Sequence, residues 1–126
     1  MKLLQDTTSL LEHIQRLKNV FLEEKPPADF KDKAFFERVK ADANPIHMLL
    51  NEWEEEALLF LKANTNAPVH PHQIVSTREN IELIIMHSHY SDVREKRYME
   101  LNISVNYVLG ILEDYLDRLC KAGAIE

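Results

Sequence analysis

The chain has 126 residues, of which 45% are hydrophobic and 29% are charged, and it carries a net charge of −6 at pH 7. This length fits a single domain over residues 1–126, and the negative charge argues against general nucleic-acid binding. The longest apolar runs, ALLFL at 57–61 and LIIM at 83–86, are too short to cross a membrane. Because the first residues do not resemble a secretory signal, we expect a cytoplasmic protein.

The first predicted helix covers residues 2–24 and ends before Pro26 and Pro27. Its apolar residues recur at steps of three and four, apart from Thr7 at one expected position, and so give the helix one face to bury. The residues of this stripe are Leu3, Leu10, Ile14, Leu17 and Phe21.

A second apolar stripe runs from Phe36 to Phe60 without losing its phase, although Pro45 lies inside it. Its other members are Val39, Ala43, Ile46, Leu50, Trp53 and Ala57. Two structures are compatible with the proline. Either Asn44 caps a new helix that has Pro45 at its first position, or one long helix is kinked there. The unbroken phase favours the single kinked helix.

The run NTNAPVHP at 64–71 predicts a loop before a third helix. Ser76 and Glu79 match a capping box for this helix, although Pro71 could begin it one turn earlier. Its stripe comprises Ile74, Thr77, Ile81 and Ile84.

The chain turns again near Ser91, where Asp92 and Glu95 offer a second capping box. The last predicted helix ends before Gly123, which suits the C′ position, and its stripe comprises Tyr98, Leu101, Val105, Val108, Leu112, Tyr115 and Leu119.

Four amphipathic helices joined by short links predict an all-α fold, an antiparallel up-down-up-down four-helix bundle. The order of the segments FFERVK, NEW, HQI after a proline-containing loop, TRENIE, REKRYM and SVNYVL resembles the YppE-like family of small helical-bundle proteins from Gram-positive bacteria. That resemblance implies a four-helix bundle and a cytoplasmic location. It implies no activity and assigns no functional residues.

Histidine pairs are the first candidates for chemistry. His70 and His72 lie at one end of the third predicted helix and His87 and His89 at the other, roughly 25 Å apart at 1.5 Å per residue, so one metal ion cannot reach both pairs. His13 and His47, near the middle of the bundle, can approach each other but neither pair. A catalytic zinc site commonly needs three protein ligands. We therefore predict no metal and no cofactor, and the alternative is a His-dependent metal-binding enzyme of the DinB-like type.

A basic corner between the third and fourth helices is the main candidate for binding. It comprises His87, His89, Arg94, Lys96 and Arg97. The last three stand where the helix dipole disfavours cations, which suggests that they hold an anion or an acidic partner. In the alternative, Asp92 and Glu95 already satisfy the free N–H groups and balance the charge, and the corner is ordinary surface.

These patterns favour a cytoplasmic binding or regulatory module without catalytic activity, a monomer or weak homodimer that binds a small anion or an unidentified protein. A second alternative is a subunit that packs on another helical protein, because apolar residues outside the stripes widen them: Leu4, Leu11, Leu58, Leu59 and Ile111. The same residues would also be explained by a fuller core.

Overall fold

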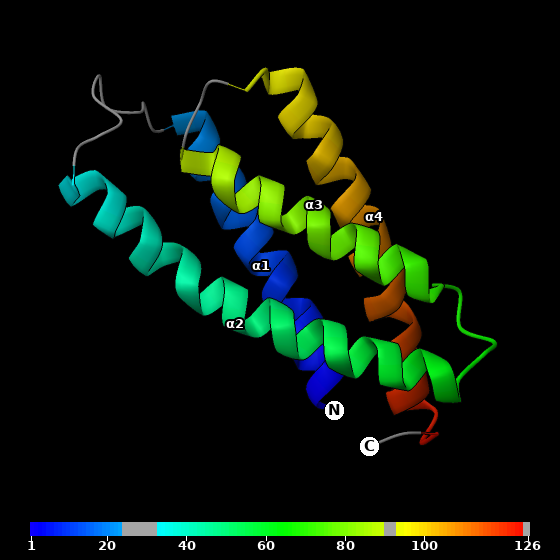
Figure 1. Ribbon diagram of the computed structural model, residues 1–126. Coiled ribbons are helices and arrows are strands. Elements are labelled where there is room, and N and C mark those ends of the chain that lie inside the picture. The colour runs from blue at the N-terminus through cyan, green and yellow to red at the C-terminus, as the bar shows by residue number, and fades with distance from the viewer. Residues whose placement is uncertain (24–32, 90–92, 125–126) are drawn as a thin grey trace.

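The computed structural model describes residues 1–23, 33–89 and 93–124. These residues form four helices, α1 (Lys2–Glu23), α2 (Lys33–Ala63), α3 (Pro71–His89) and α4 (Glu95–Lys121), and none of them forms a strand. The predicted all-α, four-helix class is therefore confirmed. In Figure 1 the chain runs up α1, down α2, up α3 and down α4.

The helices are not equivalent in the bundle. Helices α1 and α3 pack against each other and against both remaining helices, whereas the described backbones of α2 and α4 stay apart and these two helices meet through the rings of Phe60 and Tyr115, with centroids 6.3 Å apart. Helices α1 and α3 therefore form the centre of the bundle, and α2 and α4 flank it (Figure 1).

Most residues of the predicted stripes form the core, whereas Val39 and Leu119 are only partly buried. The burial of Leu10, Ile14, Trp53 and Ile81 is complete, as their spacing requires. At the start of α2, however, Phe36 is 52% exposed and Phe35 only 7% exposed. Phe36 lies three residues before Val39 and Phe35 lies four before it, and either spacing continues a helical stripe. In this helix the residue four positions before Val39, Phe35, is the buried one.

Thr7, the polar position in the first stripe, has a partner in the core. The indole Nε1–H of the fully buried Trp53 donates a hydrogen bond to Thr7 Oγ1 over 3.1 Å, and that hydroxyl donates to the carbonyl oxygen of Leu3 over 2.7 Å. A buried indole N–H needs an acceptor. Thr7 supplies it while joining α1 to α2.

Two predicted helix starts are corrected. Helix α3 begins at Pro71, and the N–H of His70 donates to Gln73 Oε1 over 2.8 Å, so the alternative start is confirmed and the capping box at Ser76 is wrong. Helix α4 begins at Glu95 with Arg94 as its N-cap residue. The sequence suggested Asp92 for that place, and Asp92 lies outside the described residues.

Pro45 lies inside α2, which continues as one helix from Lys33 to Ala63. The single helical path is therefore confirmed over two separate helices, and a kink at Pro45 stays a prediction. Pro45 removes one backbone donor, but the stripe on either side still reaches the core.

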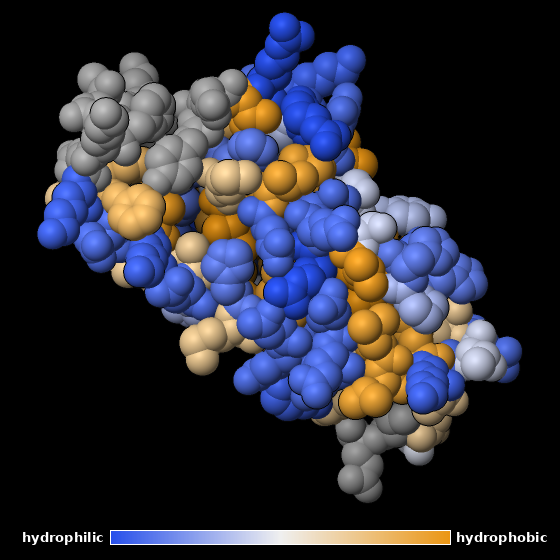
Figure 2. Space-filling view, viewed as in Figure 1, coloured by the Kyte–Doolittle hydropathy of each residue, from blue (hydrophilic) through white to orange (hydrophobic). Residues whose placement is uncertain are grey.

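Most of the surplus apolar residues belong to the core. Leu4, Leu11, Leu58 and Ile111 are partly buried and pack against it, whereas Leu59 remains 64% exposed. Figure 2 shows apolar side chains in a strip beside the C-terminal half of α2 and in a second group nearer the upper end of the molecule, with hydrophilic side chains between the two. Of the helices that the structure describes, none has the length and apolar character needed to span a membrane.

Candidate functional site

A pocket opens at one end of the bundle, where α1 and α3 end and α2 and α4 begin. We call this end the pocket pole; it is the upper end in Figure 1. The cavity measures about 220 Å³ and is lined from three helices, by Arg16 and Val20 of α1, Phe35, Arg38, Val39 and Asp42 of α2, and His89 of α3. The α2 residues recur at steps of three and four, so one face of that helix supplies a whole wall.

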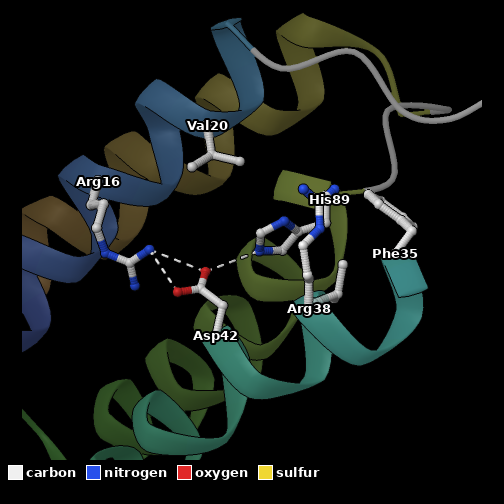
Figure 3. A pocket seen from close by; sticks show the side chains of 7 residues that line it. Arg16, Val20, Phe35, Arg38, Asp42 and His89 are labelled. Atoms are coloured by element: carbon white, nitrogen blue, oxygen red, sulfur yellow. Dashed lines mark hydrogen bonds and ion pairs between the residues drawn. The ribbon is translucent and has the colours of Figure 1, made fainter. Parts of the chain in front are cut away.

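Asp42 joins the three helices. Its two carboxylate oxygens accept hydrogen bonds from Arg16 Nη1 over 3.0 and 3.1 Å, and Oδ2 lies 3.2 Å from Nε2 of His89. Figure 3 shows the Asp42 carboxylate between Arg16 and the His89 ring. The His89 side chain is only 9% exposed, so the last turn of α3 directs this imidazole into the bundle.

Arg38 has a different environment. Its guanidinium carbon lies 5.7 Å from the centroid of the Phe35 ring, within the range of a cation–π contact. No carboxylate among the described residues lies within ion-pair distance of Arg38, whereas Arg16 is paired with Asp42. With His89 neutral, the residues lining the pocket therefore carry a net charge of one positive unit.

His13 extends the polar network along α1. Its Nδ1 lies 3.2 Å from Nη2 of Arg16. The pKa of His13 is lowered from its ordinary value, chiefly by burial and secondly by the charge of Arg16. Arg16 and Asp42 link His13 indirectly to His89. That His13 itself approaches neither histidine pair stays a prediction.

The structure brings one residue of the sequence-predicted basic corner to the pocket, namely His89. His87 is half-buried on α3 and does not line the pocket. Arg94, at the N-cap of α4, makes no capping hydrogen bond with its side chain, and Lys96 and Arg97 are exposed in the first turn.

Sequence reasoning missed Arg16, Arg38 and Asp42. The available signal was spacing: Phe35, Arg38 and Asp42 stand three and four residues apart on α2, which places charged residues beside an aromatic ring on one helix face.

In the part of the chain that the structure describes, no three His, Cys, Asp or Glu side chains converge as metal ligands.

Comparison with known proteins identifies relatives over most of the chain. The profile of DUF1798, a bacterial domain of unknown function, matches residues 7–116. The uncharacterized protein YppE of Bacillus subtilis (strain 168) is 29% identical over 84 residues, which cover 67% of this chain and 68% of YppE.

Solved structures share the fold. The crystal structure of Bacillus subtilis YppE matches with a TM-score of 0.78 and 23% identity, over 95% of this chain and 96% of that one. A crystal structure of a Listeria innocua protein of unknown function matches with a TM-score of 0.74 and 21% identity, over 96% of this chain and 95% of that one. These matches support the four-helix fold. They say nothing about what the pocket binds.

Proposed function

Because the chain belongs to the DUF1798 family, whose description names no activity, we propose from its own pocket that it is a binding module for a small anion and not an enzyme. The observation that carries this proposal is Arg38, a cation without a carboxylate partner among the described residues, on the wall of a cavity of about 220 Å³. Arginine presents a planar fork of donors that suits carboxylate and phosphate groups. An anion in the cavity would give Arg38 the partner that it lacks.

The charge distribution of the chain favours this end of the molecule. The described residues of the segments that meet at the pocket pole, 13–23, 33–47, 80–89 and 93–106, contain 8 Lys and Arg and 6 Asp and Glu. The described residues of the remaining segments, 1–12, 48–79 and 107–124, contain 5 Lys and Arg and 10 Asp and Glu, and are therefore the acidic part of the molecule. Surface charges are screened over about 8–10 Å at physiological salt. An anion that approaches the pocket pole is therefore little affected by the acidic end.

The residues predicted from sequence keep a part in this proposal. His89 lines the pocket, and Arg94, Lys96 and Arg97 add positive charge at the same pole, where His87 also lies. We propose a cytoplasmic monomer that needs no metal or organic cofactor. The ligand is a small anion, because the pocket is too small for a protein segment of any length.

Thermal unfolding with acetate and with inorganic phosphate, each compared with chloride at matched ionic strength, tests the proposal. Both anions are expected to raise the melting temperature of the native protein, since a ligand bound only by the folded state stabilises it. Arg38→Gln is expected to abolish the increment. Arg118→Gln, which removes an exposed arginine from α4 far along the bundle, is the matched control and is expected to retain it.

The double variant Arg94→Gln with Arg97→Gln separates the pocket from the basic corner. Loss of the increment in Arg38→Gln alone supports the pocket. Loss in the double variant alone places the anion at the start of α4, as the sequence suggested, and overturns the pocket proposal. Equal increments in native protein and all variants exclude a specific anion site at either place.

A further inference from the structure

We infer that the natural ligand of the pocket is a monocarboxylate with a short apolar chain. This inference rests on the proposed anion site and goes further by naming the ligand class. It follows from the two kinds of side chain that line one small cavity.

The pocket has both charged and apolar lining. Arg16, Asp42 and His89 form one hydrogen-bonded group, while Val20, Val39 and Phe35 supply apolar lining, and the Phe35 ring lies against Arg38. Figure 3 shows Phe35 and Arg38 beyond the His89 ring, on the side away from Arg16. A wholly polar anion would leave the valines in contact with water or with the anion itself. A ligand with an apolar chain buries that surface, at about 0.8 kcal/mol per methylene group.

The charge of the pocket favours a singly charged group. Arg16 and Arg38 are cationic and Asp42 is anionic, so one negative charge neutralises the lining when His89 is neutral. A doubly charged phosphate would leave an excess negative charge beside the Asp42 carboxylate. A carboxylate also matches the planar guanidinium of Arg38 with two parallel hydrogen bonds.

The volume sets the length of the chain. At about 220 Å³ the cavity is smaller than the roughly 300–1,000 Å³ of sites for drug-sized ligands. It therefore suits a carboxylate with a few carbon atoms better than a nucleotide or a long-chain fatty acid.

The experiment is a titration of the native protein with acetate, butyrate and hexanoate, followed by calorimetry or by NMR shifts. At about 0.8 kcal/mol per buried methylene, each added methylene is expected to lower the dissociation constant about 4-fold, so that butyrate binds roughly 15-fold more tightly than acetate. Hexanoate is expected to bind at least as tightly as butyrate. Inorganic phosphate is expected to bind more weakly than butyrate.

Replacement of both lining valines tests the contribution of the apolar lining. The double variant Val20→Thr with Val39→Thr keeps side-chain size but adds hydroxyl groups, and it is expected to reduce the gain from acetate to butyrate to about 3-fold or less. Val75→Thr, a change of the same kind at an exposed position of α3 outside the pocket, is the control and should keep the full gain. The melting temperature of each variant verifies that it is folded.

The outcomes distinguish a wrong ligand class from a failure of the proposed anion site. If acetate, butyrate and hexanoate bind equally and Arg38→Gln abolishes all three, the anion site stands and the apolar ligand class is wrong. Phosphate binding more tightly than butyrate overturns the ligand class in the same way. If no carboxylate and no phosphate binds, the proposed function itself fails.

Discussion

The substitution Asp42→Asn is expected to weaken the fold and strengthen anion binding at the same time. Asparagine keeps the shape of aspartate and one acceptor oxygen but removes the negative charge between Arg16 and His89. The Arg16 and Asp42 side chains are 42% and 32% exposed, so their ion pair belongs with surface pairs that contribute about 0.2–1 kcal/mol. The less exposed His89 keeps a partner in the amide. We therefore expect a loss of about 1 kcal/mol in the free energy of unfolding.

The gain in binding follows from Coulomb's law. A cavity of about 220 Å³ would place the centre of a bound carboxylate roughly 4–7 Å from its walls. At about 7 Å, removing one like charge relieves roughly 0.6 kcal/mol in water and 2.4 kcal/mol at an effective dielectric constant of 20. The dissociation constant for acetate should therefore fall by about 3-fold to 50-fold.

Urea denaturation and acetate titration of the same protein samples test both effects. Asp117→Asn is the control, because Asp117 also pairs with a cation, Lys121 Nζ at 2.9 Å, but lies in the last turns of α4 away from the pocket pole. It should change neither quantity by more than about 0.5 kcal/mol. If Asp42→Asn leaves acetate affinity unchanged or weakens it, Asp42 does not face a bound anion and the electrostatic reasoning is refuted.

Two further predictions concern stability. Thr7→Val should lower the free energy of unfolding by about 1–3 kcal/mol, because the buried Trp53 N–H loses its acceptor. Thr8→Val, which removes a part-buried bond to Glu113, should cost less, and equal losses in urea denaturation would contradict the role given to Thr7. The lowered pKa of His13 means that, as pH falls through the ordinary histidine value of about 6.5, the unfolded chain takes up a proton that the folded chain resists. Lowering the pH from 7.5 to 5 should therefore reduce the free energy of unfolding more in the native protein than in the His13→Gln variant. Parallel curves of stability against pH for the two proteins would be evidence against this linkage.

The core was accessible from sequence because helical burial follows a period that single residues rarely disturb. Trp53, Ile81 and Val105 are fully buried where their spacing placed them. Even the mistaken choice of Phe36 over Phe35 is an error of one position near a helix end. There, fewer neighbouring turns constrain which face is buried.

The pocket was less accessible because it depends on contacts between residues distant in sequence. Asp42 lies 26 positions from Arg16 and 47 from His89, and no local pattern relates them. Sequence reasoning also treated His89 as a member of a histidine pair, when its closest polar partner is a carboxylate on another helix. A helix places residues two apart roughly 200° from each other. His89 can therefore turn inward without His87.

Arg94, Lys96 and Arg97 were selected because cations near a helix N-terminus oppose the helix dipole, and the same observation applies to α2. That helix begins with Lys33, has no acidic residue in its first turn and carries Arg38 in its second. Both α2 and α4 begin at the pocket pole, so the positive ends of two helix dipoles and several cations are found at the same end of the bundle. Such an arrangement is unfavourable in the empty protein and becomes favourable when an anion binds. Arg94, Lys96 and Arg97 are exposed at the start of α4, and Arg38 is exposed as well, so water screens all four charges. Arg38 differs from the other three because it lines a cavity and lies beside the Phe35 ring, and for that reason we propose the anion in the pocket before the start of α4.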